Sequence, residues 1–236
     1  AAFAIRQLGE GSVVGSGATW TRAENTNGST TQIMDASLAF AHRPDESEVA
    51  MLGKLEFRSD RVTGAVQGAV AGAGRTALLV DGDAKSSRLV ASLSTNWSPR
   101  GWDEDENGID QQTRRDEYTL FLGARYNFDE FEGTEFSGTT VLAGLDARLC
   151  VTDMFELGVS GTVRANLEDD VTSFSYGPTI GVSPVQDTLI TIGYNIDGFR
   201  DGDFAAARNT SKGLFAAVRI KFDTDTLSFL GLGERR

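Results

Sequence analysis

An acidic segment near the middle of the chain has the residue spacing of a calcium-binding loop. Four candidate ligands lie on either side of Gly108, the glycine at the bend: Asp103, Asp105, Asn107 and Asp110. Carboxylate and amide oxygens are the ligands that Ca²⁺ prefers. The twelfth position of such a loop needs a bidentate glutamate, but this chain has Arg114 there. We therefore expect a solvated acidic loop and keep calcium as the alternative; no other cofactor is expected.

A second motif reads GFRDGDF. It contributes the candidate residues Phe199, Arg200, Asp201, Asp203 and Phe204. Aspartates beside glycine favour a self-capping turn, in which both carboxylates accept hydrogen bonds from backbone N–H groups and the arginine pairs with an acidic neighbour. The alternative is a loop that grips a partner or folds over the interior. We predict the self-capping turn, placed in an outer loop.

Catalytic chemistry has few candidates. His42 is the only histidine and Cys150 the only cysteine, so an internal disulfide is excluded. A hydrolase of the Ser–His–Asp kind needs its histidine beside a nucleophile. Period-two alternation instead puts His42 on the apolar side of a strand, close to a short turn. We therefore do not expect an enzyme.

Charged residues of both signs recur on the polar side of strand-like segments. The candidates are Arg125, Asp146, Arg148, Glu156, Arg164, Asp197 and Arg219. The positions between them are mostly glycine, serine and threonine, which suit a crowded interior filled by side chains. We predict a network of interior ion pairs; a ring of charges that selects ions in a pore is the alternative.

The elements that carry these residues are strands. Period-two alternation recurs in about ten segments, each near the length that a tilted membrane strand requires. They cover residues 13–22, 34–40, 54–58, 88–97, 118–128, 140–150, 155–164, 174–183, 189–197 and 213–222. If the Gly- and Ala-rich stretch Val62–Val80 forms an extra hairpin, the number becomes twelve. The last segment ends at Phe222, an aromatic signal typical of a closing membrane strand.

The two faces of these segments favour a membrane protein over a soluble one. Leu214, Ala216 and Val218 share one face of the last segment, while Arg219 and Lys221 share the other. Outer-membrane strands are apolar toward lipid, polar toward the lumen and aromatic at the water boundary. A soluble sandwich or lipocalin-like barrel, the alternative, would turn a strongly charged face to water.

Composition and connections complete the prediction. A formal charge of −12 over 236 residues argues against nucleic acid as a partner. Connections alternate between short turns, such as 183–187, and long polar ones; the long acidic connection 98–115 breaks this rhythm. The fold class we predict is all-β: an antiparallel up-and-down transmembrane β-barrel over residues 1–222, followed by a tail at 223–236. Short turns and both termini are expected on the periplasmic side.

The closing segment also resembles a known group. Gly193–Phe204 and Arg219–Asp223 are similar to the last hairpin of C-terminal outer-membrane barrel regions of large repeat-containing surface proteins of Gram-negative bacteria, chiefly proteobacteria. The run Val141–Val163 and the tail Leu227–Gly233 resemble the same group, so that the likeness covers residues 10–236. It implies an outer-membrane location at the end of a longer polypeptide and no enzyme activity.

These observations predict a structural role. We expect a barrel that anchors or docks a larger surface polypeptide or assembly, with its lumen plugged by ion pairs. Its expected partners are the lipid bilayer, lipopolysaccharide and other surface or envelope proteins. The alternative is a porin-like channel for small solutes, and a barrel enzyme is less favoured because no histidine lies at the lumen rim.

Overall fold

The structure is a computed structural model. It describes residues 1–24, 28–44, 47–71, 78–104, 110–131, 133–152, 154–185, 188–201, 204 and 210–220. Within these ranges the regular structure is all strand, and no helix is long and apolar enough to cross a membrane.

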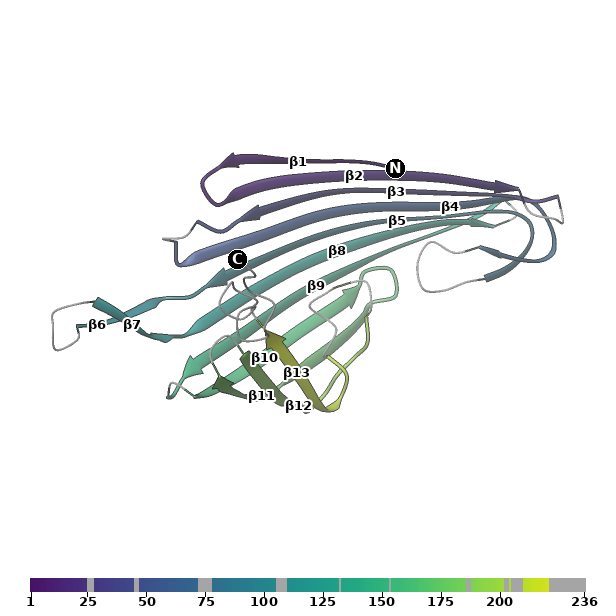
Figure 1. Ribbon diagram of the computed structural model, residues 1–236. Helices are drawn as coiled ribbons and strands as arrows, with labels where there is room; N and C mark the ends of the chain where they lie inside the picture. The colour runs from purple at the N-terminus through teal and green to yellow at the C-terminus, as the bar shows by residue number, and fades with distance from the viewer. Residues whose placement is uncertain are drawn as a thin grey trace.

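Eleven strands form one antiparallel sheet, and they follow one another in chain order (Figure 1). They are β1 (Ala2–Gly9), β2 (Ser12–Glu24), β3 (Thr30–His42), β4 (Val49–Ala71), β5 (Leu78–Trp97), β8 (Glu117–Phe131), β9 (Thr134–Cys150), β10 (Phe155–Asn166), β11 (Val171–Val185), β12 (Thr188–Asn195) and β13 (Gly213–Ile220). Two more strands, β6 (Arg100–Glu104) and β7 (Asp110–Arg115), pair only with each other. The predicted all-β, antiparallel, up-and-down architecture is confirmed.

Each of the ten predicted segments overlaps one strand from β2–β5 or β8–β13. The stretch Val62–Val80 makes no separate hairpin, because β4 extends to Ala71 and β5 begins at Leu78, and the two strands stay paired. The long connection 98–115 contains the β6–β7 ribbon, which lies at the same end of the sheet as the short turns (Figure 1).

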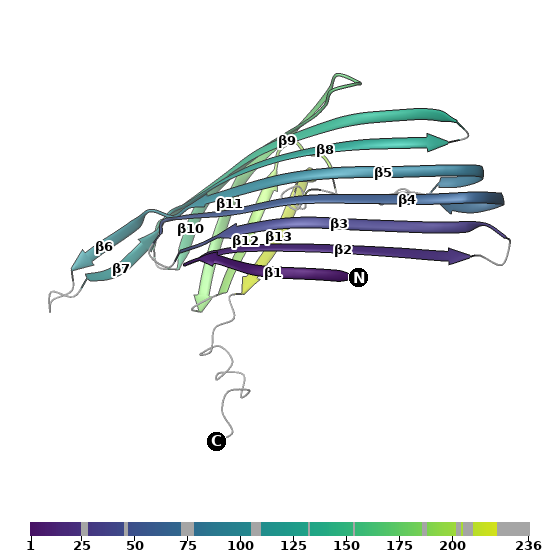
Figure 2. The ribbon, with the colours of Figure 1, turned by 90° about the horizontal axis from the view of Figure 1, so that it is seen from above.

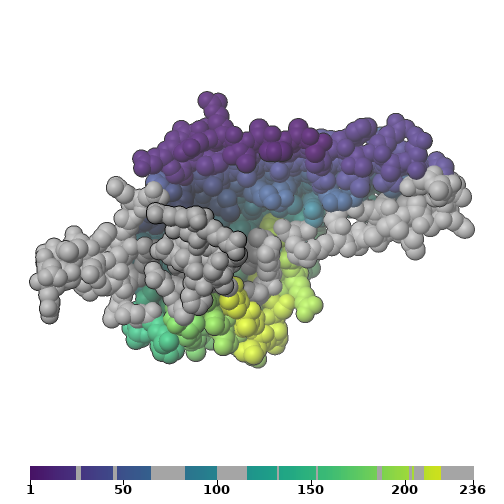
Figure 3. Space-filling model, in the orientation of Figure 1, coloured from purple at the N-terminus to yellow at the C-terminus, as the bar shows by residue number. Residues whose placement is uncertain are grey.

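The strand that sequence patterning did not count is β1. It pairs with β2, and it stands at the opposite edge of the sheet from β13 (Figures 1 and 3). With eleven strands, β1 and β13 run in the same direction, toward the short turns. Ala2 lies opposite Ala18, part-way along β2, and β1 starts from the side of the long connections. The start of β1 and the end of β13 therefore lie toward opposite ends of the strands.

The register aligns the apolar stripes of neighbouring strands on one face, here called the outer face. Leu122, Ala143, Val163 and Phe174 lie opposite one another across β8–β11. The face is open to the surroundings: Leu145 and Val159 are each 57% exposed. Because side chains alternate along a strand, the opposite, inner face receives the polar residues.

The sheet is strongly coiled. β10–β13 lie below β1–β5 in Figure 1, and the directions of the two sets of strands cross when seen from above (Figure 2). The hydrophobic cluster found among the described residues is small and lies on the inner face. It consists of Val90, Phe121, Leu142, Phe199 and Phe204. The last two come from the connection between β12 and β13, so this connection covers the inner face of β5, β8 and β9.

Candidate functional site

Phe204 anchors the β12–β13 connection in the inner face. Its side chain is 1% exposed and meets Phe121 edge to face, with ring centroids 6.5 Å apart. The space for the ring exists because residue 123 is glycine: a Cβ there would lie 2.7 Å from Phe204 Cε1. The sheet thus contains a slot that fits this aromatic ring.

Asp201 joins the same connection to two strands. Its Oδ1 accepts a hydrogen bond from Arg125 Nη1 at 3.1 Å, and its Oδ2 lies 3.6 Å from Arg164 Nη1. The aspartate side chain is only 3% exposed. Burying charge is costly unless it is paired, and here one carboxylate serves two guanidinium groups from β8 and β10.

Both arginines also lie over aromatic rings. The Arg125 guanidinium is 5.7 Å from the ring centroid of Phe204, and that of Arg164 is 4.9 Å from Phe199. Such cation–π contacts strengthen as water is excluded. We call Phe199, Asp201 and Phe204 the plug residues, because they fill the inner face and tie it together.

The two ends of the connection are held together at its neck. Phe199 N donates to Thr210 O at 2.9 Å, and Thr210 Oγ1 donates to Phe199 O at 2.8 Å. Gly198 lies so close to the returning chain that a Cβ would come within 2.2 Å of Thr210 O. The neck therefore fixes the plug residues at a defined depth.

The self-capping turn predicted for GFRDGDF stays a prediction, because it depends on backbone groups outside the described residues. The described residues show that Asp201 bonds to Arg125 on a distant strand, and that the partner of the Arg200 guanidinium is the hydroxyl of Ser211 and not the predicted acidic neighbour. Phe199 and Phe204 lie against the inner face, as the alternative of a segment folded over the interior predicts. The physical reason is burial: two phenylalanines leave water, and the aspartate neutralises arginines already facing inward. Asp203 lies outside the described residues.

A second cluster surrounds Arg148, which is 7% exposed. Its Nε lies 3.2 Å from Asp146 Oδ1, and its Nη1 lies 3.6 Å from Glu156 Oε2. Glu117 at the start of β8 pairs with the third guanidinium nitrogen. The sequence prediction missed Glu117, because it precedes the clearly alternating part of its strand.

The remaining candidates are Asp197, Arg219 and Phe222. Asp197 is exposed and accepts a hydrogen bond from Gly198 N at 2.9 Å, so its place in the predicted network was wrong. It lies where β12 has ended and the chain turns, so alternation no longer holds. The Arg219 side chain and all of Phe222 lie outside the description. The first half of the sheet adds ion pairs that were not predicted, such as Arg58–Asp60 at 3.2 Å.

Between the plug residues and the Arg148 cluster lies a polar cavity of about 270 Å³. Hydroxyl groups dominate its lining: Thr119, Ser160, Thr162, Ser175, Thr179, Thr191 and Thr210. A space of this kind suits ordered water. Phe121 and Arg148 also line it.

The calcium candidates gain no support from the described residues. Asp105 and Asn107 lie outside them, and Asp103 and Asp110 are described only as backbone in the β6–β7 ribbon. Among the described side chains, no group of three or more His, Cys, Asp or Glu residues is arranged to hold a metal ion.

His42 has a partner that sequence reasoning missed. Its Nδ1 lies 2.7 Å from Ser12 Oγ across the β2–β3 pair, and its ring stacks on Phe40. No described carboxylate completes a triad with this pair. The contact follows from the register, in which Ser12 and His42 are direct neighbours.

Comparison of the chain with known protein families, with curated proteins and with solved structures finds no match in any of the three.

Proposed function

We propose that this chain is an outer-membrane β-barrel that anchors or docks a larger surface polypeptide or assembly. The observation that carries the proposal is the exposed outer face. Large apolar residues on nearly every strand lie on it and remain open to the surroundings, including Leu38, Leu55, Leu122, Leu145, Val159, Ile180 and Ile192. Soluble monomers rarely expose continuous apolar patches beyond a few hundred Å², whereas hydrocarbon solvates such a face at no cost.

The distribution of charge supports the same proposal. Arg148 and Asp201 are buried on the inner face, while Leu145 and Val159 point outward. A soluble β-sandwich has the reverse arrangement. Membrane β-barrels have polar residues inside and apolar residues outside, facing lipid.

Closure of the sheet is part of this proposal. Lipid leaves no water for an exposed strand edge, so a sheet in the membrane must close. Antiparallel closure needs an even number of strands, and β2–β5 with β8–β13 supply ten. We propose that β1 is displaced and that β13 then closes against β2. The displaced β1 is available for contact with the larger polypeptide or assembly.

An anchor fits the inner face better than an open pore does. The plug residues and the Arg148 cluster fill the interior with paired charges and aromatic rings. The hydroxyl-lined cavity of about 270 Å³ is the observation that favours the second candidate, a channel for small solutes. That candidate requires the plug residues to move.

Under this proposal the long connections face the cell exterior and the short turns face the periplasm. Because β2 begins at the short-turn end of the sheet, residues 1–11 leave the barrel on the periplasmic side once β1 is displaced.

The experiment that tests the proposal is insertion into phosphatidylcholine vesicles, followed by gel mobility with and without heating and by protease protection. Leu145→Arg places a charge in the middle of the lipid-facing stripe and should cost about 2–4 kcal/mol of insertion free energy. Thr134→Arg adds the same charge at the exposed start of β9 and should insert normally. A chain that stays a monodisperse, folded monomer in buffer without detergent would overturn the proposal.

A further inference from the structure

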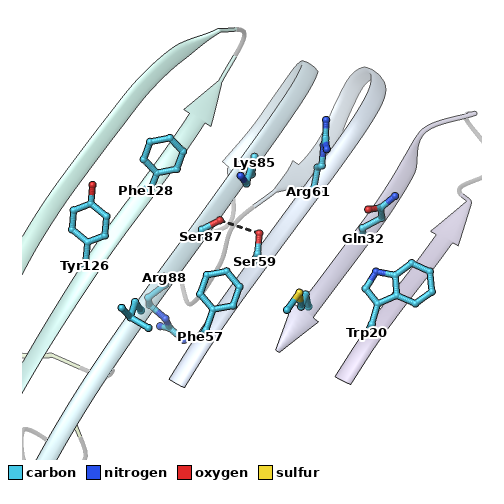
Figure 4. Close-up of a pocket in the computed structure, with 12 residues that line it drawn as sticks. Trp20, Gln32, Phe57, Ser59, Arg61, Lys85, Ser87, Arg88, Tyr126 and Phe128 are labelled. Atoms are coloured by element: carbon cyan, nitrogen blue, oxygen red, sulfur yellow. Dashed lines mark hydrogen bonds between the residues drawn. The ribbon is translucent and has the colours of Figure 1, made fainter. Parts of the chain in front are cut away.

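A groove of about 520 Å³ runs across the outer face of β2–β5 and β8 (Figure 4). Its apolar part is lined by Trp20, Met34, Phe57, Leu89, Tyr126 and Phe128. These side chains come from five neighbouring strands, and the register holds Trp20, Met34 and Phe128 in one row across the sheet. The groove is therefore a product of the sheet itself and not of a mobile loop.

One end of the groove is cationic. Gln32, Arg61 and Lys85 are direct cross-strand neighbours in the row beyond the aromatic one. Figure 4 shows Arg61 and Lys85 on the hairpin side of Ser59 and Ser87. Two residues along a strand advance by about 7 Å, so the cations lie one row above the apolar groove.

The two cations are available for a ligand. Among the described residues, no carboxylate lies within ion-pair distance of Arg61 or Lys85, although Glu130 is the cross-strand neighbour of Lys85. Lys85 Nζ lies 5.7 Å from the Phe128 ring centroid, where the aromatic face holds it beside the groove. In a chain of net charge −12, two adjacent cations without acidic partners form a local site for an anion.

We propose that this groove binds lipid A, the phosphorylated glycolipid of the outer leaflet. An acyl chain lies along the apolar part, and a headgroup phosphate accepts hydrogen bonds from Arg61 and Lys85, with Gln32 donating to the sugar. The inference rests on the proposed function, which puts the long β4–β5 hairpin on the exterior side. The outer leaflet there is built of a lipid with acyl chains below and phosphates above.

The order of chemistry along the groove supports this occupant. Phe57, Leu89 and Tyr126 form the first row. The Ser59–Ser87 hydroxyl pair, joined at 2.9 Å, lies in the next row between Met34 and Phe128, and the cations follow in the third row. A free phosphate makes no favourable contact with the apolar part, and an acyl chain alone makes none with the cations. Only an amphipathic anion satisfies both, and arginine and lysine are the side chains that bind phosphate.

The test measures binding of purified bis-phosphorylated lipid A to the full chain in phosphatidylcholine nanodiscs, by displacement of a fluorescent lipid A. We expect the double variant Arg61→Gln, Lys85→Gln to bind at least about tenfold more weakly, since each charge-assisted hydrogen bond contributes on that order. The matched control is Arg6→Gln, Lys212→Gln, which removes two exposed cations elsewhere and should bind normally. Dephosphorylated lipid A should lose affinity for the wild type, and inorganic phosphate should not displace lipid A.

Each outcome has one meaning. If the two double variants bind equally, attraction is only general and the inference fails. If inorganic phosphate displaces lipid A, the cations form a free-phosphate site and the inference also fails. Insertion into phosphatidylcholine vesicles, which contain no lipid A, reports on the proposed function separately: a wild type that inserts but does not distinguish the variants loses the inference alone.

Discussion

A Cβ on Gly123 would lie 2.7 Å from the ring of Phe204, so the smallest residue of β8 stands beneath the most buried aromatic residue of the β12–β13 connection. The two residues are remote in sequence, and the ring of Phe204 fits only because residue 123 lacks a side chain. The same segment carries Asp201, which at this depth lies 3.1 Å from Arg125 Nη1 and 3.6 Å from Arg164 Nη1.

The first prediction concerns this contact. Gly123→Ala should lower the free energy of unfolding by about 1–3 kcal/mol, because the methyl group has no space and the ring of Phe204 must shift. Urea unfolding in lipid vesicles measures the change. Gly161→Ala is the matched control, since a Cβ at Gly161 meets nothing within 4 Å. Equal effects of the two substitutions would contradict the fit of Phe204.

The second prediction concerns the buried carboxylate. Asp201→Asn leaves two inward arginines without their shared negative charge and should lower the free energy of unfolding by about 3 kcal/mol. The exposed pair Arg22–Glu24 provides a control: Glu24→Gln should change stability by less than about 0.5 kcal/mol. Combining Asp201→Asn with Arg125→Gln should cost less than the sum of the single changes, and strict additivity would show that the two groups do not interact.

The third prediction separates anchor from channel. Wild-type protein in planar bilayers should show no steady conductance, because the plug residues close the inner face. A variant with residues 199–210 replaced by a short Gly–Ser linker should show discrete openings, since Phe199 and Thr210 already meet at the neck. A steady open wild-type pore would replace the anchor with the channel.

The fourth prediction is a pH dependence outside the strands. Glu168 accepts a hydrogen bond from the backbone N–H of Thr139 at 2.6 Å, and this bond lowers the pKa of the carboxyl below its ordinary value. A lowered folded-state pKa gives stability that is fully present above the unfolded-state pKa and is lost as the pH falls through the folded-state pKa.

Glu168→Gln should therefore be less stable than wild type at neutral pH, and the difference should shrink in acid. Urea midpoints measured from neutral pH down to about pH 3 test this, since ordinary glutamate titrates near pH 4. A difference that does not change with pH would show that the hydrogen bond does not favour the charged carboxylate.

The fifth prediction concerns β1. All eight of its residues are exposed, and Phe3 and Ile5 lie on the inner-face side, opposite to the apolar stripes of the outer face. Deleting residues 1–9 should therefore leave vesicle insertion and the urea midpoint unchanged. Failure of the shortened chain to insert would show that β1 belongs to the closed sheet.

The sequence predicted the strands well because period two is a local signal. One residue of slip turns a whole apolar stripe to the wrong face, so register follows once the stripes are known. The outward placement of Leu145 and the inward placement of Arg148 follow from the same rule. β1 was not counted among the ten predicted segments. Its alternation is short and has the opposite sense, with apolar residues on the inner-face side.

The clusters on the inner face were less predictable. Alternation identified Arg125, Arg148 and Arg164 as inward residues, but it carries no information about which carboxylate each one meets. Asp201 lies in a loop without any periodic pattern, and Glu117 lies at a strand start. Local reasoning therefore favoured a self-capping turn, which needs no distant partner.

The chain by itself determined which residues form strands and which side of each strand is apolar, because both depend on neighbours in the sequence. Only the tertiary structure decided what covers the polar side: the β12–β13 connection turns inward because Phe199 and Phe204 find apolar contacts on β5, β8 and β9, and Asp201 finds arginines on β8 and β10. Those partners come together only when the sheet coils, and no local pattern records the free energy gained by their burial.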